Sequence, residues 1–488
     1  MKSRRLLPIQ LIALAVLLVG ACAKAPLVPD APKGPAQWLR SIASACTTST
    51  TDASGGQVSY QFDWGDDTKS EWSPFLDGGV QYADTHSYAN IGSYQIKVRA
   101  KNSKRASGWS DPLSIRVVAE GNVAWSVGFT DPDDIEDSSD FSLNTFAIGS
   151  DHTAYIACDY GALIACKPSG GIAWKFVLPD LDQIMAAPVL ADDGTILIGC
   201  SNDFIYALNP DGSVKWADSV GQVAATGALG ADGTAYFQTV DSMIIALRSD
   251  GSTLWTFDSI GGNAAPVVGT DGTVYAANQD GVVYAINPDG SQKWQYLFNL
   301  PSVQAPAIDP SRNRLYVVSD AGALQSVDLT TGLAGISTNV GQDASGPVVG
   351  PDGSVFISGG GVLTKLSPDF DELWKFTPPF GVLSTPALTV DGYVYVLAVA
   401  GKKGRLALQD DVDSLYAVNP DGTQRWACGL GEGLSDPEYP LSAPKIDPNG
   451  LIYVGDGFRG WCVGGLSAPA QSIWPTFQHD AQNSGRAR

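Results

Sequence analysis

Short apolar runs separated by polar turns fill the sequence from residue 120 to its C-terminal end. In the clearest copy, residues 264–295, three apolar runs are bounded by Asp271-Gly272 and by Asn287-Pro288-Asp289-Gly290, and a fourth run contains Trp294. Asp-Gly supplies the positive φ that tight hairpin turns require, and proline presets φ in the second turn. The pattern predicts a unit of four short antiparallel strands that repeats along the chain.

A tryptophan marks the last strand of most units. The spacing between Trp294 and Trp374 is about twice the usual one, and it hides a copy in which Gly335 stands at the tryptophan position. Eight last strands are therefore predicted, one for each unit of about 40 residues. The tryptophans are Trp125, Trp174, Trp216, Trp255, Trp294, Trp374 and Trp426.

The first strand of most units carries a proline, which cannot donate a backbone hydrogen bond to a neighbouring strand. Such a strand belongs at a sheet edge, as does the innermost strand of a propeller blade. Trp125 precedes the first complete unit, so its strand should pair near 451–454 and 460–463 and close the ring. We predict an all-β fold with an eight-bladed β-propeller over 120–488. The prolines are Pro188, Pro266, Pro306, Pro347, Pro386 and Pro444.

The segment Ala-Leu-Asn-Pro-Asp-Gly-Ser-Val-Lys-Trp, from Ala207 to Trp216, resembles the pyrroloquinoline-quinone-like (PQQ-like) repeat. The tail from Trp474 to Arg486 also looks like a segment common in that superfamily, and the resemblance extends over 120–488. It implies the quinoprotein dehydrogenase fold. Those enzymes hold the quinone between a tryptophan floor and a disulfide of adjacent cysteines, with Ca²⁺ bound by Glu, Asn and Asp beside a catalytic Asp. This chain has no adjacent cysteine pair, so we expect no PQQ, no Ca²⁺ and tryptophans that pack between blades.

A different pattern precedes the repeats. Val58, Tyr60, Phe62 and Trp64 alternate with polar residues and predict a strand with one buried face. The run from Tyr60 to Asp67, followed by His86-Ser87-Tyr88 and by Gly92-Ser93-Tyr94, resembles the PKD domain, and Gly108-Trp109-Ser110 is similar to fibronectin type III domains. Residues 37–119 are therefore expected to form a small immunoglobulin-like β-sandwich that acts as a spacer or an adhesion module. His86 is expected to pack against its aromatic neighbours.

The N-terminus is a targeting signal. Lys2, Arg4 and Arg5 precede the apolar stretch Leu11–Val19, which is too short to span a bilayer. Val19-Gly20-Ala21-Cys22 resembles the bacterial lipobox, so we expect residues 1–21 to be a signal peptide and Cys22 to carry the lipid. Its acyl chains would give stable anchoring, and Ala23 favours the outer membrane or cell surface. The proline-rich stretch 22–36 is expected to be an extended tether.

Charge and composition exclude several functions. The formal net charge of −21 opposes nucleic-acid binding, which needs a basic surface. Three histidines, and no nucleophile elbow, phosphate loop or metal motif, give no sign of an active site, although paired carboxylates of a hydrolase would leave no sequence motif. Six cysteines follow Cys22. They are expected to be free and buried, with a Cys158–Cys200 disulfide as the alternative.

Three insertions depart from the minimal unit. They follow the last strand of blade 8 at 131–140, lengthen blade 7 at 401–413, and follow its last strand at 431–440. These connections leave the same end of an up-and-down blade, and blades 7, 8 and 1 are consecutive in a closed ring, so the insertions should converge on one face. Loops on a rigid scaffold commonly carry binding residues. The candidates are Asp131, Asp133, Asp134, Glu136, Asp137, Lys402, Lys403, Arg405, Glu432, Asp436, Glu438 and Tyr439. The acidic 131–140 loop is alternatively a Ca²⁺ site or, as we favour, solvated charge.

The sequence predicts a noncatalytic, membrane-anchored binding scaffold of the bacterial envelope. Its partner would be an envelope protein or a polysaccharide, recognised by the propeller face with the insertions. A related possibility is an assembly factor, similar to the propeller lipoproteins of the outer-membrane β-barrel assembly machinery, which lack an N-terminal sandwich. The alternative is a quinone- or metal-dependent oxidoreductase of the quinoprotein type. The sequence does not define the oligomeric state.

Overall fold

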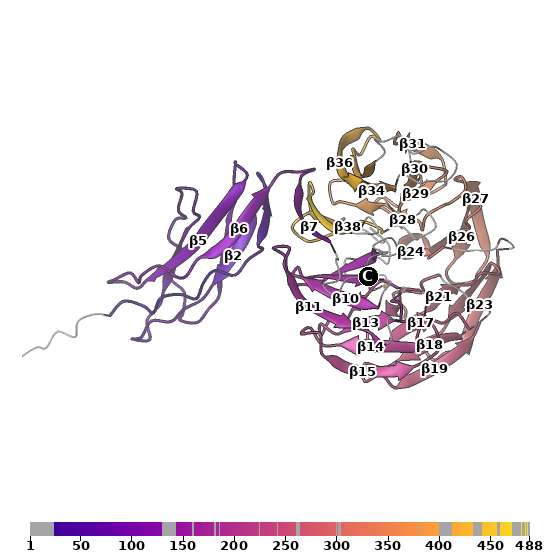
Figure 1. Ribbon diagram of the computed structural model, residues 1–488, viewed down its shortest axis with the longest axis horizontal. Helices are drawn as coiled ribbons and strands as arrows, with labels where there is room; N and C mark the ends of the chain where they lie inside the picture. Colours follow the sequence, from indigo (N-terminus) through magenta and orange to yellow (C-terminus); the bar gives the residue numbers. More distant parts are fainter. Residues whose placement is uncertain are drawn as a thin grey trace, which may run out of the picture. The chain divides into compact units, whose positions relative to one another are not determined.

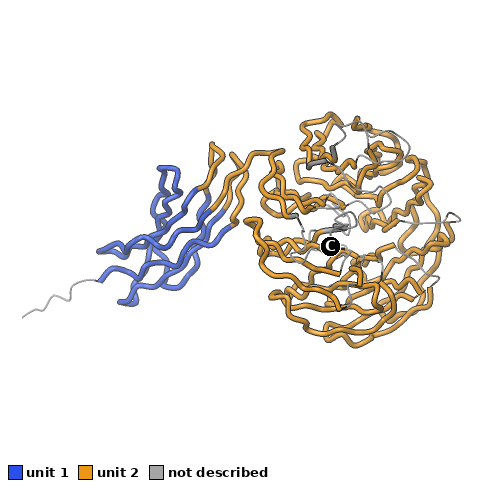
Figure 2. The backbone as a smooth tube through the Cα atoms, viewed as in Figure 1, with its two compact units in different colours: residues 1–34, 45–85, 94–114 blue, residues 35–44, 86–93, 115–488 orange. Residues whose placement is uncertain are grey.

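The chain is described here from a computed structural model. The structure describes residues 24–128, 143–158, 161–179, 182–184, 186–223, 225–241, 243–259, 264–298, 300, 304–379, 381–399, 412–432, 442–455, 459–470, 480, 484 and 486. Within these ranges, no helix combines the length and the apolar character that crossing a bilayer requires. The chain divides into two compact units, one of residues 1–34, 45–85 and 94–114, the other of residues 35–44, 86–93 and 115–488 (Figure 2).

The N-terminal part is a sandwich of two sheets. The larger sheet has the strand order β1-β6-β5-β3, and the smaller one pairs β2 with β4. Val58, Tyr60, Phe62 and Trp64 are all buried, as their alternation with polar residues predicts. The ring of His86 packs edge-on against Tyr88 with 4.6 Å between centroids, which confirms the expected packing. The strands are β1 (Gln37–Leu39), β2 (Ser44–Thr48), β3 (Ser59–Asp63), β4 (Tyr82–His86), β5 (Gly92–Lys101) and β6 (Leu113–Val118).

The second unit contains eight sheets arranged around a common axis (Figure 1). Within each sheet, neighbouring strands are antiparallel. They follow sequence order from the inner strand to the outer one except in blade 8, whose outer strand comes from the start of the repeat region. Blade 1 is β8 (Leu143–Ile148), β9 (Ala154–Cys158), β10 (Ala162–Cys166) and β11 (Ile172–Val177). Blade 2 is β12 (Val189–Leu190), β13 (Ile196–Gly199), β14 (Phe204–Leu208) and β15 (Val214–Ser219). Blade 3 is β16 (Ala228–Leu229), β17 (Ala235–Gln238), β18 (Met243–Leu247) and β19 (Thr253–Asp258).

The next three blades repeat this arrangement. Blade 4 is β20 (Val267–Val268), β21 (Val274–Ala277), β22 (Val282–Ile286) and β23 (Gln292–Leu297). Blade 5 is β24 (Ala307–Asp309), β25 (Arg314–Val318), β26 (Ala323–Asp328) and β27 (Ala334–Asn339), with a 3-10 turn at Pro310–Arg312. Blade 6 is β28 (Val348–Val349), β29 (Val355–Gly359), β30 (Val362–Leu366) and β31 (Glu372–Phe376).

The last two blades complete the ring. Blade 7 is β32 (Val382–Leu383), β33 (Ala387–Leu388), β34 (Val394–Val399), β35 (Val412–Val418) and β36 (Gln424–Glu432). Blade 8 is β37 (Lys445–Ile446), β38 (Leu451–Gly455) and β39 (Arg459–Gly464), and its outer strand is β7 (Val123–Gly128) from the start of the repeat region. The pairing of Cys462 with Trp125 confirms that the two ends of the repeat region close the ring.

A cross-strand row of side chains recurs in every blade. In blade 4, Tyr275 on the second strand lies opposite Ala285, which lies opposite Trp294 on the outer strand. The ring centroids of Tyr275 and Trp294 are 5.7 Å apart, and the row belongs to the same apolar cluster as blade 5. The side chains of these rows pack against the neighbouring blade. A smaller side chain in a row would therefore leave a cavity between two blades.

The outer-strand tryptophan of one blade also locks onto a turn of the next blade. The indole Nε1 of Trp255 donates to the carbonyl oxygen of Pro288 at 2.9 Å, and a Cβ built on Gly290 would lie 2.8 Å from the indole ring. Gly290 has φ of +87°, which glycine adopts without strain. The same contact joins Trp125 to Gly170, Trp174 to Gly212, Trp216 to Gly251, Trp294 to Gly332 and Trp374 to Gly422.

Blade 5 corrects one detail of the sequence interpretation. Gly335 does not occupy the tryptophan position, because Ile336 is the third residue of β27, as Trp294 is the third residue of β23. The preceding turn is one residue longer. Gly332 donates its N–H to Asp328, four residues back, whereas Gly290 donates to Asn287, three residues back.

The cysteines after Cys22 form no disulfides in the structure. All six are buried, namely Cys46, Cys158, Cys166, Cys200, Cys428 and Cys462. Burial raises the pKa of Cys46, Cys166 and Cys200 to about 12, so these thiols stay protonated and weakly nucleophilic at neutral pH.

Candidate functional site

A departure from the repeated row creates a pocket between blades 2 and 3. The second-strand position of the row is aromatic in the seven other blades but Leu197 in blade 2. Leu197 lies opposite Ala207, which lies opposite Trp216. In the part of the chain that the structure describes, no aromatic ring contacts Trp216. The aromatic residues of the other rows are Tyr155, Tyr236, Tyr275, Tyr316, Phe356, Tyr395 and Tyr453.

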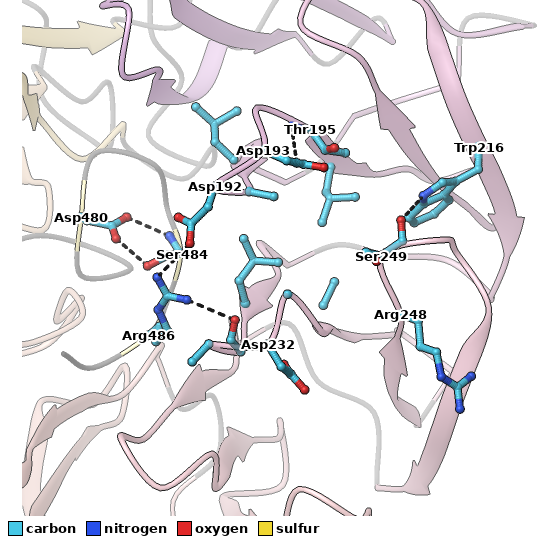
Figure 3. A pocket seen from close by; sticks show the side chains of 18 residues that line it. Asp192, Asp193, Thr195, Trp216, Asp232, Arg248, Ser249, Asp480, Ser484 and Arg486 are labelled. Atoms are coloured by element: carbon cyan, nitrogen blue, oxygen red, sulfur yellow. Dashed lines mark hydrogen bonds and ion pairs between the residues drawn. The ribbon is translucent and has the colours of Figure 1, made fainter.

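The pocket has a volume of about 300 Å³ and lies beside Leu197 and Trp216 (Figure 3). Two turns border it, one at 191–195 in blade 2 and the other at 230–233 in blade 3. This volume is at the lower end of the range for small-molecule sites. The apolar part of its lining is Leu190, Ala191, Leu197, Trp216, Leu229, Ala231 and Ala235.

The polar side chains of the pocket lie at the two turns and at the C-terminal tail. They are Asp192, Asp193, Thr195, Asp232, Arg248, Ser249, Asp480, Ser484 and Arg486. The hydrogen bond with Thr195 and the ion pair with Lys215, 3.0 Å long, lower the pKa of Asp193 to about 2. Asp193 therefore stays ionised at any physiological pH. Arg248 donates to the Thr253 carbonyl at 2.9 Å and so is held on its own turn.

The C-terminal tail supplies one wall of the pocket. Leu229 of β16 donates its N–H to the carbonyl of Ser484 at 2.7 Å, and Asp480 accepts from the Ser484 N–H at 2.9 Å. Arg486 donates to the Gly230 carbonyl at 3.2 Å and lies 3.8 Å from the carboxylate of Asp192. The described tail residues therefore bind the inner ends of blades 2 and 3, at the end that bears the tight Asp-Gly turns.

A buried lysine ties the same tail to blade 8. Lys445 on β37 is 0% exposed, and its Nζ donates to the Asp480 carbonyl at 3.1 Å. Burial lowers the pKa of Lys445 to about 7, and the Asp480 carboxylate opposes that shift. Lys445 heads the blade-8 row, in which it lies opposite Tyr453, and Tyr453 lies opposite Cys462.

A contact between a histidine and a carboxylate joins the turns of blades 8 and 1 at the ring closure. Nδ1 of His152 lies 2.9 Å from a carboxylate oxygen of Asp447, which is fully buried. The other oxygen of Asp447 accepts from the backbone N–H groups of Asn449 and Leu451 at 2.9 and 2.8 Å. These bonds hold the carboxylate in place. The contact of His152 with it therefore connects blade 1 to blade 8.

Almost all of the predicted binding residues lie outside the described residues. This holds for Asp131, Asp133, Asp134, Glu136, Asp137, Lys402, Lys403, Arg405, Asp436, Glu438 and Tyr439, and also for the lipidation site Cys22. Glu432 is the last residue of β36, and nothing is described of its side chain. The predicted insertion surface therefore stays a prediction.

The functional residues that the sequence reasoning missed are single departures from the repeat. Lys445 stands where Val189, Val267 and Val348 begin the equivalent inner strands, and Leu197 stands where the other blades carry an aromatic residue. An alignment of the units residue by residue contains both signals. The contribution of Asp480 and Arg486 has no such signal, because the tail lies outside the repeat.

The described residues do not fit the quinone site that the PQQ-like resemblance implies. That site needs adjacent cysteines joined in a disulfide, and the described cysteines are not in disulfides and are separated in sequence. It also needs a tryptophan face open to the cofactor beside that disulfide; Trp255 and Trp294 pack against glycine turns, and Trp216, which lines the pocket, has no disulfide beside it. No cluster of metal-ligating side chains occurs within the described ranges.

Two families match parts of the sequence. The family described as outer membrane protein assembly factor BamB matches residues 161–362, and the PKD domain matches residues 37–109. No curated protein matches the chain. The expected PQQ-like repeats and the expected PKD-type sandwich are both confirmed.

Solved β-propellers share the fold. BamB from Moraxella catarrhalis superposes with a TM-score of 0.53 at 18% identity, over 70% of this chain and 97% of that one. The C-terminal WD40 domain of Sif2 gives a TM-score of 0.55 at 13% identity, over 67% and 97% of the two chains. The computationally designed Ika8 protein gives 0.53 at 11% identity, over 66% and 96%. Likeness at these identities establishes the propeller fold.

Proposed function

We propose that this chain, which joins a PKD domain to a propeller of PQQ-like repeats, is a noncatalytic protein-binding scaffold anchored in the bacterial cell envelope. The family match over residues 161–362 supports this role, since that family is described as an outer membrane protein assembly factor. The match includes Leu197, Trp216 and both turns that border the pocket. The chain would act by holding a partner rather than by transforming it.

The observation that carries the proposal is the pocket beside Trp216. Its walls are the turns of two blades that are locked to each other, because Trp216 donates to the Ser249 carbonyl at 3.0 Å and packs on Gly251. A concave apolar pocket on rigid elements binds a protein side chain without an ordering cost in the scaffold. The proposed insertion surface, with residues 131–140, 401–413 and 431–440, would be a second contact on the same propeller.

Anchoring is proposed through Cys22. The basic and apolar segments before it, and the small residues at positions 20 and 21, support lipidation and an outer-membrane or cell-surface location. Cells grown with labelled palmitate should incorporate label into the wild-type chain but not into a Cys22→Ala variant, which should move to the soluble envelope fraction. A Cys22→Ala variant that stays with the membranes would contradict the anchor.

Partner binding is tested by photo-crosslinking in intact cells. A photoreactive amino acid at Asp192, on the pocket rim, should give adducts with an envelope protein. The matched control is Thr270, the equivalent exposed turn position in blade 4. Adducts at 192 but not at 270 support the proposal. Equal adducts at both positions, or none at either, overturn it.

A further inference from the structure

We propose that the pocket between blades 2 and 3 accepts an aromatic side chain from a segment of the partner protein, with a lysine or arginine beside it. This inference rests on the proposed function, because it names the part of the partner that the pocket takes. Leu197 of blade 2 occupies the row position that is aromatic in every other blade. The chain lacks one ring at this interface, and the pocket lies where that ring is missing.

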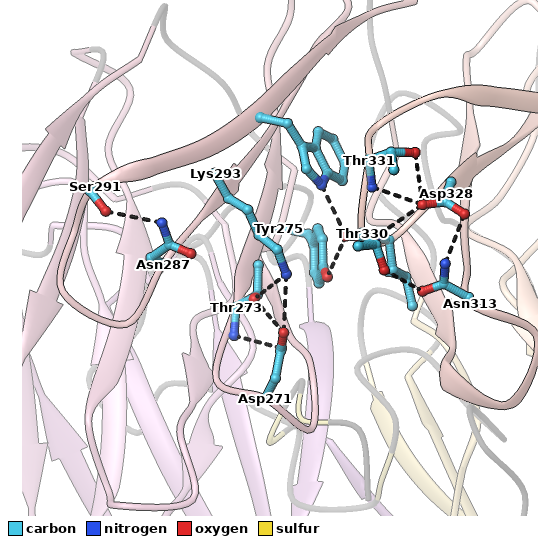
Figure 4. Close-up of polar contacts among 12 residues, drawn as sticks. Asp271, Thr273, Tyr275, Asn287, Ser291, Lys293, Asn313, Asp328, Thr330 and Thr331 are labelled. Carbon is cyan, nitrogen blue, oxygen red and sulfur yellow. Dashed lines mark hydrogen bonds and ion pairs between the residues drawn. The ribbon is translucent and has the colours of Figure 1, made fainter.

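The neighbouring rows show how a ring fits at this position. Tyr236 packs against Trp255 with 5.6 Å between centroids and an interplanar angle of 38°. In blade 4, Tyr275 and Trp294 are 5.7 Å apart, and Tyr275 points toward the turn of blade 5 that carries Asp328 (Figure 4). Both residues bond to the carbonyl of Leu329, at 3.4 and 2.9 Å. Tilted ring pairs at such distances are favourable beyond the area they bury.

Blade 5 shows that a ring supplied from outside a blade can complete its row. Its outer strand carries Ile336 in place of tryptophan. The ring of Phe370, from a turn of blade 6, packs against that of Tyr316 with 5.9 Å between centroids. At blade 2, the residue that corresponds to Phe370 in the next blade is Gly251. No described residue of this chain therefore supplies the missing ring, and the space beside Trp216 stays open (Figure 3).

The charges around the pocket select the flanking residues of the occupant. Four carboxylates line it, from Asp192, Asp193, Asp232 and Asp480, against the guanidinium groups of Arg248 and Arg486 and the Lys215 ammonium group that pairs with Asp193. Arg248 is held by the Thr253 carbonyl, and the Asp192 side chain is 88% exposed at the rim. A chain with a net charge of −21 also attracts basic segments at long range. An aromatic residue next to lysine or arginine fits both the hollow and its rim, and tyrosine, tryptophan and arginine are enriched among the residues that contribute most to binding at protein interfaces.

The test uses the purified full-length protein and acetylated, amidated pentapeptides of sequence Gly-Lys-Xaa-Lys-Gly, with Xaa as Tyr, Phe, Leu or Ala. Binding is measured by saturation-transfer NMR and by titration calorimetry. The Tyr and Phe peptides should bind about tenfold more tightly than the Leu peptide and should lose that preference in a Leu197→Tyr variant. That variant restores the ring that the other blades carry, so it should fold and keep or raise the wild-type Tm.

A second variant provides the matched control. Tyr236→Leu removes the ring of the blade-3 row and should open an equivalent hollow beside Trp255, which adds a second site for the Tyr peptide. Failure of the Tyr peptide to bind the wild type, equal binding by the Leu peptide, or undiminished binding to Leu197→Tyr overturns the proposal. Self-association of the wild type that Leu197→Tyr abolishes would also overturn it, by assigning the pocket to a second copy of the chain.

The outcomes separate this inference from the proposed function. Crosslinking at position 192 in cells with no preference for aromatic peptides in solution would leave a binding scaffold whose pocket recognises different chemistry. Aromatic preference without any crosslinked partner in cells would support the inference on the pocket and overturn the envelope role.

Discussion

At the scale of single residues, the propeller replaces one missing tryptophan with three separate side chains. Ile336 occupies the tryptophan position of blade 5, and Phe370 of blade 6 supplies the ring. The guanidinium of Arg314 donates to the Pro368 carbonyl, the turn position whose equivalents, Pro288 among them, accept from indole groups in other blades. Phe370 has φ of +67°, where the other turns use glycine. A tryptophan would collide with a Cβ at that position, so its absence is what permits a side chain there.

This exchange predicts strong coupling between positions 336 and 370. Ile336→Trp alone should destabilise the propeller by about 1–3 kcal/mol, because the indole meets Phe370 in a filled space. Phe370→Gly alone should cost about 3–5 kcal/mol by leaving a cavity, less the strain that glycine relieves. The double variant should recover part of the loss, since it rebuilds the tryptophan–glycine contact of the other blades. Denaturant unfolding of all four proteins gives the coupling energy. Additive losses would contradict the exchange.

Lys445 makes stability depend on pH in a defined direction. Its pKa is about 7 in the folded chain against 10.5 for an ordinary lysine, so between these values the unfolded chain binds a proton that the folded chain does not. This group therefore makes the folded state more stable as pH rises from 7 to 10.5, by about 1.4 kcal/mol per pH unit. Below pH 7 the lysine is protonated in both states, and its cost is greatest and constant.

A Lys445→Met variant removes that titration while keeping a long side chain. We expect Met to be most favourable relative to the wild type below pH 7, with an advantage that shrinks steadily toward pH 10. Thermal unfolding of both proteins across this range measures the difference directly, and pH effects of other groups cancel. A difference that is constant with pH would mean that Lys445 titrates normally and is not desolvated.

At the scale of the element, the turn between the third and fourth strands of a blade requires glycine where the tryptophan of the preceding blade packs on it. Gly251 and Gly233 lie in two turns of blade 3 and have similar φ values of +87° and +82°. A Cβ on Gly251 would lie 2.8 Å from Trp216, whereas a Cβ on Gly233 meets nothing within 4 Å. The two positions share the same backbone strain and differ only in the ring above them.

Gly233→Ala should therefore cost only the left-handed backbone penalty, about 1–2 kcal/mol. Gly251→Ala also displaces the Trp216 indole, which donates to the carbonyl of Ser249 two residues earlier, and should cost about 1–3 kcal/mol more. Comparison of the two Tm values isolates the tryptophan contact. Equal losses would show that the lock between blades does not constrain the turn.

The elements were largely predictable because each strand unit carries its own turn chemistry. Asp-Gly turns, alternating apolar residues and the outer tryptophans give the blades, and the edge prolines give their inner side. The tryptophan position of blade 5 could not be predicted from the spacing in the other units, because its turn contains one extra residue. That residue moves the position from Gly335 to Ile336. The pocket was missed because Leu197 is an ordinary apolar residue in sequence, and only the pairing of three strands shows that a ring is absent.

At the scale of the whole molecule, ring closure rests on noncovalent contacts of one strand. β7 pairs with β39 from Val123 to Gly128, and Trp125 packs on Gly170 of blade 1 while donating to the Pro168 carbonyl at 3.0 Å. The His152–Asp447 pair joins the same two blades at their turns. Within the described residues, these side-chain and strand-pairing contacts hold the first and last parts of the repeat region together.

A protease site placed within residues 131–140 tests that closure. After cleavage, β7 and the blades that begin at residue 143 are separate chains, yet they should co-elute in size-exclusion chromatography and separate only in denaturant. Introducing Trp125→Ala into the cleavable protein should weaken the association, because it removes both the packing on Gly170 and the bond to Pro168. Spontaneous separation of the wild-type fragments after cleavage would contradict closure by β7.

The position of β7 also sets an order of events. A chain made from its N-terminus offers Val123, Trp125 and Val127 long before residues 459–464 exist to receive them. During that interval this strand is an unpaired apolar edge, the kind of segment that associates with other chains. Maturation of the ring must therefore wait until residues 459–464 have been made. Any premature stop before residue 459 would release a product that keeps several formed blades and one open edge, a natural substrate for holding chaperones and proteases.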